Sequence, residues 1–492
     1  MKRAPALLLS VVLAGGVVPL AQAASPPPVA QAAQPLVTME DGLRQVIDEA
    51  LTANLELRAS GATVQQRLAA LDQARARYLP VIDFAARYSM ADGGRTIEFP
   101  VGDLLNPVYE TLDQMLVAQG QSPQFPRVQN QSIAFLRDQE QETKLVLEQP
   151  LYEPRIGPAV NSTRADAARA EADLAALRSQ VIRDVKQAYY RWIAAQQAVT
   201  VLDATLAATR ENLKANASLY RNGKVTRDLV YRAEADVLEV EQERLATASR
   251  VRIAQSYVNL LRNAPLSQPL PNAALDAETI ERFHARLLSA LAGRQVDTLK
   301  LQDLASQRRE ELKSLDAAIA VGEARQDLAR AAFKPSLAFG AEAGIQGTEY
   351  GFADEDRYVL ASLVLRFNAF RGGADQAALR EARALTDQLR ATRELAGQQV
   401  RLEVQQALEN FEVAEASLDT AAKRAEAANG AFAITARKRD LGQINQAEFI
   451  DARRAQTDAQ LNVTRVRAEY LARLAELEFS IGDARRIERE RM

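Results

Sequence analysis

The chain has 492 residues, with 61 lysines and arginines against 64 aspartates and glutamates, which gives a formal net charge of −3. A nucleic-acid binder would carry a basic excess, so this balance argues against that class. The chain holds no cysteine and only one histidine, which excludes thiol catalysis, cysteine-based zinc or iron–sulfur sites, and disulfide bonds. We therefore expect no catalytic residues, no cofactor and no metal site, and we do not expect an enzyme.

Residues 1–23 have the pattern of an export signal. A positively charged start and an apolar stretch that Pro19 closes are followed by a small-x-small cleavage pattern ending at Ala23. A transmembrane anchor is the alternative, but the apolar run is short for a spanning helix. A proline-rich linker follows over residues 24–37. No later run is apolar enough to span as a helix, so we expect the periplasm, the exterior or an outer-membrane β-barrel.

Two similar series of elements follow the linker. We predict a helix over about 38–78, then two strands joined by a long loop with a short helix near 109–118, then two long helices forming a hairpin. An equatorial segment leads to a second series, in which the strand hairpin is tighter. The predicted bounds are a first repeat 38–265 (strands about 80–90 and 143–152, long surface loop 91–142, helical hairpin 156–262), a linker or equatorial segment 266–307, a second repeat 308–482 (strands about 335–347 and 357–370, helical hairpin 374–481) and a charged C-terminal tail 483–492.

The four predicted strands alternate between apolar and polar residues. Ile82, Phe84 and Tyr88 share one face of the first strand, and the residues from Leu337 to Ile345 show the same period of two in the third. Segments of about ten such residues suit tilted strands that cross a membrane. Four strands cannot close a barrel, and open strand edges are not tolerated in lipid. Membrane strands of this kind therefore require several chains to combine.

The long helices carry apolar residues at seven-residue intervals. Val185, Trp192 and Leu206 belong to one row, and Val404 and Phe411 belong to its counterpart in the second half. Heptad rows of this kind predict coiled-coil packing. A run of roughly 60 residues without proline or glycine makes a rod on the order of 90 Å long. We expect the tryptophan to pack in this core rather than to contact a cofactor.

The two halves match at constant offsets, which indicates an internal twofold repeat. Gly223 returns as Gly442 at an offset of 219 residues, and Pro80 returns as Pro335 at an offset of 255. The 36-residue difference corresponds to an insertion in the first half. Both glycines lie at predicted turns between long helices, where a left-handed cap favours glycine.

Several segments carry a more specific resemblance. They are LEQPLYEP at 147–154, LYRNGKVTRDLVYRAEADV at 219–237, RDLGQINQAEFIDARRAQ at 439–456 and LTANLELRASGATV at 51–64. In their order, duplication and spacing they resemble the outer-membrane efflux protein family, the TolC-like channels. The resemblance covers about residues 36–482. Each motif is short, and their combination is what makes the resemblance specific.

The resemblance implies a mainly α-helical chain with a membrane β-barrel. In a homotrimer, four strands per chain would complete a twelve-stranded barrel in outer-membrane lipid, and the helical hairpins would form an α-barrel reaching into the periplasm of a Gram-negative bacterium. Such a protein is the passive exit duct of a tripartite efflux pump or a type I secretion system. Its partners are a periplasmic adaptor (membrane fusion) protein and an inner-membrane transporter, which supplies the energy. The chain accordingly has no G-x-x-x-x-G-K-[ST] loop.

The resemblance also implies a periplasmic gate lined by acidic side chains of the last hairpin. Glu448 and Asp451 lie at the matching positions, six and nine residues beyond Gly442. Three copies of each would form carboxylate rings that attract cations and raise one another's pKa. The alternative is that both residues are ordinary acids on a solvated helix face.

Four further residues near the turns are weaker candidates for contacts that lock the gate or hold the adaptor. They are Tyr220, Arg221, Asp228 and Arg439. The first-half turn departs from the family pattern, because Leu229 occupies the acidic position and Asp228 stands next to it.

A periplasmic adaptor or coiled-coil scaffold without a pore is the alternative function. An adaptor would carry a single helical hairpin flanked by lipoyl-like β-rich halves, whereas two hairpins and four alternating strands argue against it. His284 has no second histidine or cysteine to share a metal with, so we expect a structural role for it.

Overall fold

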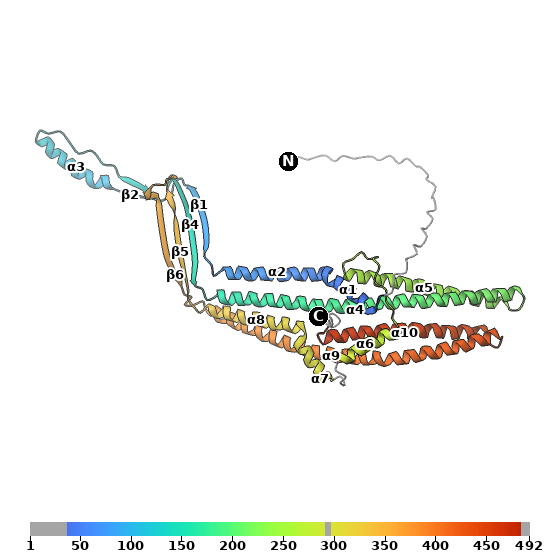
Figure 1. The fold of residues 1–492 in the computed structure, drawn as a ribbon. Helices are drawn as coiled ribbons and strands as arrows, with labels where there is room; N and C mark the ends of the chain where they lie inside the picture. The colour runs from blue at the N-terminus through green and yellow to red at the C-terminus, as the bar shows by residue number, and fades with distance from the viewer. Residues whose placement is uncertain (1–36, 291–296, 484–492) are drawn as a thin grey trace, which may run out of the picture.

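The computed structural model describes residues 37–290 and 297–483 and is mainly helical (Figure 1). The expected export signal 1–23, the linker before Val37 and the tail beyond Asp483 lie outside these residues. The helices are α1 Met39–Ala53, α2 Leu55–Ala76, α3 Val101–Ala118, α4 Ile156–Arg221, α5 Arg227–Leu261, α6 Ala277–Ala290, α7 Thr298–Arg308, α8 Glu310–Ala331, η1 Asp354–Asp356, α9 Ala374–Asp440 and α10 Gln446–Ser480. The strands are β1 Val81–Met90, β2 Thr96–Phe99, β3 Gln131–Ala134, β4 Gln139–Tyr152, β5 Ser336–Gly347 and β6 Arg357–Arg366.

Two very long helices form the body of the molecule. Helices α4 and α9 contain 66 and 67 residues, which corresponds to about 100 Å each. Each is followed by a 35-residue helix, α5 or α10, that packs back along it, and both turns lie at the end far from the sheet (Figure 1). The predicted heptad positions Val185, Trp192, Val404 and Phe411 are buried. Because α10 also packs on α4, the two hairpins form one bundle.

Asn54 divides the first helical stretch in two. The sequence predicted one helix over 38–78, but α1 ends before Asn54 and α2 begins after it. The Asn54 Oδ1 accepts hydrogen bonds from the backbone N–H groups of Glu56 and Leu57 at 2.9 and 3.0 Å, and its Nδ2 donates to the Leu261 carbonyl at 2.8 Å. An asparagine side chain that caps the next helix competes with the backbone bonds that would continue the first one. The expected single helix is therefore wrong at this position.

The four-stranded antiparallel sheet has the order β1-β4-β5-β6, so the two strand hairpins meet in its middle. The register places Ile82 beside Leu147, Leu147 beside Ala341, and Ala341 beside Ala361. Because side chains alternate along a strand, this row belongs to one continuous apolar face. The alternating apolar positions predicted for the first strand, such as Ile82 and Phe84, and those from Leu337 to Ile345 in the third strand lie on this face.

The opposite face of the sheet carries a cluster of charged side chains. Lys144 Nζ lies 3.0 Å from Glu342 Oε2 and 3.1 Å from Glu142 Oε1, and Arg87 Nη2 lies 3.3 Å from Glu142 Oε2. The Tyr358 hydroxyl donates to Glu142 at 3.3 Å. One side of the sheet therefore suits an apolar surrounding, and the other side suits water.

The segment between β1 and β4 is more structured than the sequence indicated. We predicted a long loop over 91–142 with a short helix near 109–118. The structure pairs β2 with β3 and places the 18-residue helix α3 between them. The proline and glycine content of the segment 91–142 favoured a loop. In the structure, Asn106 Nδ2 donates to the Val128 carbonyl and Asn106 Oδ1 accepts from the Val128 N–H, both at 2.9 Å. The returning chain thus supports the helix.

The last strand is shorter than expected. The sequence predicted a strand over 357–370, but β6 ends at Arg366. Beyond it, the Asn368 side chain donates to Asp375 at 2.5 Å, in the first turn of α9. The chain therefore leaves the sheet early in order to start the long helix.

Candidate functional site: the far ends of the helical hairpins

The turns at the far ends of the two hairpins share one geometry. Gly223 and Gly442 both have a φ of +70°. The N–H of the residue after each glycine donates to the carbonyl five residues back, at 3.0 and 2.9 Å. This bonding closes each long helix with a Schellman cap. No atom lies within 4 Å of the place where a Cβ would stand on either glycine. Glycine is therefore favoured at both positions by the left-handed backbone conformation and not by lack of space.

Glu448 and Asp451 lie in the first two turns of α10, close to Gly442. Asn445 caps this helix, because its Oδ1 accepts from the Glu448 N–H at 2.9 Å and its Nδ2 donates to Glu448 Oε1 at 2.8 Å. A spacing of three residues puts both carboxylates on one side of the helix, and both are exposed. The structure brings the two predicted acids together at a helix N-terminus, where the helix dipole favours negative charge.

Arg439 connects three helices at this end. Its guanidinium carbon lies 4.0 Å from the centre of the Phe449 ring on α10. Its Nη1 lies 3.5 Å from the Asn212 Oδ1 on α4, and its Nη2 donates to the adjacent Asp440 at 2.8 Å. This side chain therefore ties the turn of the second hairpin to the first hairpin.

The turn of the first hairpin has more local contacts. The Thr226 hydroxyl donates to Asp228, and Arg232 Nε lies 3.9 Å from the same carboxylate. Tyr220 and Arg221, at the end of α4, are exposed. These residues are accessible for contacts with another chain.

A buried ion pair joins the two hairpins a few turns above the glycines. Arg453 Nη2 on α10 donates to Asp236 Oδ1 on α5 at 2.5 Å, and the two side chains are only 5% and 2% exposed. Burial raises the pKa of Asp236, and the nearby Arg453 opposes that shift. Close by, the hydroxyls of Thr205 on α4 and Thr457 on α10 lie 3.1 Å apart in the buried interior.

The sequence alone did not predict this pair. The signal that could have identified it is a charged residue inside a buried stripe: Asp236 lies between Ala233 and Val240 on the buried side of α5, and Arg453 lies between Ile450 and Thr457 on the buried side of α10. A charge at such a position needs a partner, since burying it alone is costly.

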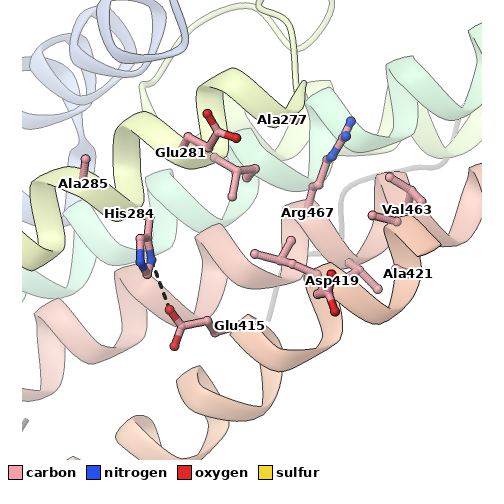
Figure 2. A pocket seen from close by; sticks show the side chains of 13 residues that line it. Ala277, Glu281, His284, Ala285, Glu415, Asp419, Ala421, Val463 and Arg467 are labelled. Carbon is pink, nitrogen blue, oxygen red and sulfur yellow. Dashed lines mark ion pairs between the residues drawn. The ribbon is translucent and has the colours of Figure 1, made fainter. Parts of the chain in front are cut away.

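His284 lies in a pocket away from the turns. The pocket has a volume of about 450 Å³ between α6, α9 and α10. Figure 2 shows His284 facing Glu415 across it, with a distance of 3.1 Å between Nδ1 and the Glu415 Oε1. The same Nδ1 lies 3.2 Å from the Tyr470 hydroxyl, whose pKa is raised by burial and by the charge of Glu415. The histidine thus belongs to a polar contact between helices.

Across the described residues, no cluster of three or more histidine, aspartate or glutamate side chains could hold a metal ion. Within the same part of the chain, every helix is too short or too polar to cross a membrane.

Comparison with known protein families shows which family the chain belongs to. The family model described as outer membrane efflux protein matches residues 46–262 and 301–483, which is more than half of the sequence. The chain belongs to the outer membrane efflux protein family. The resemblance inferred from the sequence motifs is thereby confirmed. The family is one of outer-membrane channel proteins that act in efflux, and it is not a family of enzymes. A comparison with curated proteins finds no match.

Solved structures of channels show the same fold. The chain is similar to the outer-membrane channel OprN, with a TM-score of 0.70 at 18% identity, covering 90% of both chains. It is similar to the CmeC outer-membrane channel of Campylobacter jejuni, with a TM-score of 0.72 at 15% identity, covering 90% of this chain and 86% of that one. It is also similar to the open state of the MtrE outer-membrane channel of Neisseria gonorrhoeae, with a TM-score of 0.69 at 18% identity, covering 90% and 89%.

Proposed function

We propose that this member of the family is the outer-membrane exit duct of a tripartite efflux pump or a type I secretion system. The observation that carries the proposal is the sheet, with one continuous apolar face from Ile82 to Ala361 and a charged face around Lys144. Transmembrane barrel strands have this alternation, with the apolar side toward lipid and the polar side toward a water-filled lumen.

The free edges of the sheet support a homotrimer. Strands β1 and β6 each lack a neighbour on one side within the described residues, and lipid does not tolerate such open edges. Three copies of a four-stranded sheet complete a twelve-stranded barrel. Apart from the segment β2-α3-β3 inserted in the first half, the chain passes twice through the order helix, strand, strand, long helix, helix. This order supports the internal repeat at offsets of 219 and 255 residues.

Below the barrel, the paired long helices of three copies continue the wall as an α-barrel into the periplasm. With lengths of about 100 Å, α4 and α9 reach far from the membrane. The hairpin ends meet a periplasmic adaptor protein there, and Tyr220, Arg221 and Asp228 are the accessible candidates for that contact. The inner-membrane transporter supplies the energy, and this chain conducts the substrate passively.

The periplasmic gate lies at the same end. Three copies of Glu448 and Asp451 form carboxylate rings around the axis, and such rings attract cations. The contacts of Arg439 with Phe449 and Asn212 support a part in holding the closed state, because they join the second hairpin to the first.

The duct is tested on the protein purified from outer membranes. We expect a trimer band on an unboiled gel that becomes a monomer band on boiling, and discrete conductance steps in a planar lipid bilayer. A water-soluble monomer without conductance would overturn the proposal and would favour the scaffold alternative.

The gate is tested by divalent cation block of that conductance. Replacing Glu448 and Asp451 together by alanine should weaken the block. Asp458→Ala is the matched control, because this acid is exposed on the same helix one heptad further from the turn, where we expect a wider lumen. Unchanged block in the double variant, with the trimer intact, would remove these two residues from the gate.

A further inference from the structure

The segment between β1 and β4 forms an arm at the outer end of the molecule. It contains the paired strands β2 and β3 and helix α3. Figure 1 shows α3 beyond the sheet, on the side opposite the long helices. In the proposed trimer, three such arms stand at the outer opening of one barrel.

One side of α3 is fully engaged by the returning chain. Asn106 bonds both backbone polar groups of Val128. Asp113 Oδ1 accepts from two successive backbone N–H groups, the second of them that of Phe125. The rings of Tyr109 and Phe125 stack with centroids 5.2 Å apart. The arm is thus a built unit with a defined inner side.

The acidic residues of α3 also have partners within the arm. Glu110 Oε1 lies 2.7 Å from Arg127 Nη2, and Asp103 Oδ2 accepts from the Asn130 side chain at 2.9 Å. Together with Asp113 these are the charged residues of the helix, which contains no lysine or arginine.

The other side of α3 is an apolar stripe, which we call the α3 seam. Its members follow one another at steps of four, three, four and three residues, which is the spacing of a coiled-coil core. They are Val101, Leu105, Val108, Leu112 and Met115. All are accessible in the single chain, and the last four are exposed. Glu110 and the two aspartates fall outside the seam, so no charge interrupts it.

The contacts with the returning chain leave the apolar side of α3 unpacked. Pro107 removes one backbone hydrogen bond inside α3, and most of the stability of a protein helix comes from packing of its apolar side. No other helix or strand of the described residues packs extensively on α3. The seam therefore calls for an occupant from outside the single chain.

We infer that the occupant is α3 of the two other copies, so that three seams pack as a three-helix coiled coil across the outer opening. This inference rests on the proposed trimer. Twelve strands about 4.8 Å apart and tilted by about 40° close a backbone cylinder about 25 Å across. A helix of 18 residues is about 27 Å long. This length exceeds the distance from the rim to the axis of such a cylinder, so the three arms can meet at the axis. Their shared anchorage raises the effective concentration of the seams.

The charge of α3 argues against a lipid surface as the occupant. Helices that lie on membranes carry lysine and arginine on their polar side, whereas the only charged residues of α3 are the acids Asp103, Glu110 and Asp113. A bundle of three seams has no such requirement. The outer opening thereby acquires a constriction of its own, separate from the periplasmic gate.

The absence of cysteine from the chain allows a clean cross-linking test. Leu112→Cys places one thiol per copy in the seam, and Gln114→Cys is the matched control on the outward side of the same helix. In the purified trimer treated with copper phenanthroline, we expect the seam thiol to form a disulfide-linked dimer roughly tenfold faster than the control thiol, because the bond requires Cβ atoms about 3.5–4.5 Å apart.

The outcomes separate this inference from the proposed trimer. Loss of the trimer band on an unboiled gel of the unmodified protein would count against the trimer itself. An intact trimer with equally slow cross-linking at both positions would overturn only the coiled coil. Protection of the Leu112→Cys thiol from a water-soluble maleimide in phosphatidylethanolamine–phosphatidylglycerol vesicles, without cross-linking, would place the seam on lipid and would also overturn it.

A second measurement reads the constriction directly. Val108→Gln combined with Leu112→Gln should raise the single-channel conductance, because polar seams no longer hold the arms together, while Gln114→Ala should leave it unchanged. Equal conductance in all three proteins would contradict a closed outer opening.

Discussion

The buried pair of Asp236 and Arg453 allows a quantitative test of how the two hairpins are joined. Their side chains are 2% and 5% exposed, so both charges have lost most of their water. The bond of 2.5 Å uses one carboxylate oxygen, while the Asp236 Oδ2 and the Arg453 Nε are buried without a partner. Arg454 Nε is the next nearest cation, at 3.9 Å from the Asp236 Oδ1. The pair is therefore only partly satisfied.

Removing one member should cost much more than removing both. Asp236→Leu leaves the arginine buried without its partner, so this variant should lose about 3–5 kcal/mol of stability. Arg453→Met leaves the buried aspartate with only Arg454, 3.9 Å away, so this variant should lose at most that amount. The double variant replaces both charges with apolar side chains. Because the native pair leaves two polar atoms unsatisfied, we expect the double variant to be close to the unmodified protein or up to about 4 kcal/mol more stable.

The assay is denaturant unfolding of the detergent-solubilised protein, followed by the loss of its helical circular dichroism. An exposed pair on the same two helices provides the control. Arg454 and Glu239 form an ion pair with side chains 47% and 59% exposed, so Glu239→Gln should cost less than about 1 kcal/mol.

Additive losses in the double variant would refute the reasoning. A double variant as unstable as the sum of the two single variants would mean that the residues act independently. A Glu239→Gln variant as damaged as Asp236→Leu would mean that burial does not decide the cost.

Three further predictions concern the same bundle. Arg453→Met leaves an ionised Asp236, and burial already raises the pKa of this carboxyl in the folded chain. Acidification therefore protonates Asp236 in the folded chain before it does so in the unfolded chain. The loss of stability relative to the unmodified protein should shrink from neutral to mildly acidic pH. The deficit of Asp236→Leu should not shrink and should grow slightly, because the guanidinium does not titrate there while the raised pKa of Asp236 lets the unmodified protein gain stability on acidification. Unfolding at several pH values checks both variants. Gly442→Ala should cost about 1–2 kcal/mol because its φ is left-handed, whereas Gly430→Ala, within α9 and with open space around it, should gain about 0.5–1 kcal/mol; the same unfolding assay separates them. Trp192→Ala should cost about 3–5 kcal/mol, because the ring is buried beside Tyr189; a loss below 1 kcal/mol would exclude it from the core.

The parts of the fold that could be predicted from the sequence are those with a regular spacing of apolar residues. The period of two in β1 identified the face of Ile82 and Phe84, and the register joins that face to the matching residues of the other three strands. The heptad spacing identified Val185 and Trp192, both of which are buried. These patterns are dictated by helix and strand geometry, so they are readable without knowledge of the partners.

The features that the sequence did not predict depend on contacts between distant segments. The break at Asn54 includes a bond to Leu261, 207 residues away, and the pair of Asp236 and Arg453 joins residues 217 apart. The helix α3 is supported by bonds from Asn106 to Val128, in a returning segment without regular structure whose composition indicated a loop. Glu448 and Asp451 were placed at the turn by resemblance, and one chain cannot form the proposed rings by itself.

The order of the sheet constrains how the chain is made. The central pair of strands is β4 and β5. The ion pair between Lys144 and Glu342 joins residues that are 198 positions apart in the sequence. Contacts between such distant residues form slowly, because a long loop must close before they are gained. The first strands therefore emerge during synthesis well before the strand that completes their pairing. Until the second half has been made, the apolar face of the first two strands lacks its neighbouring strands and has to be kept from aggregation.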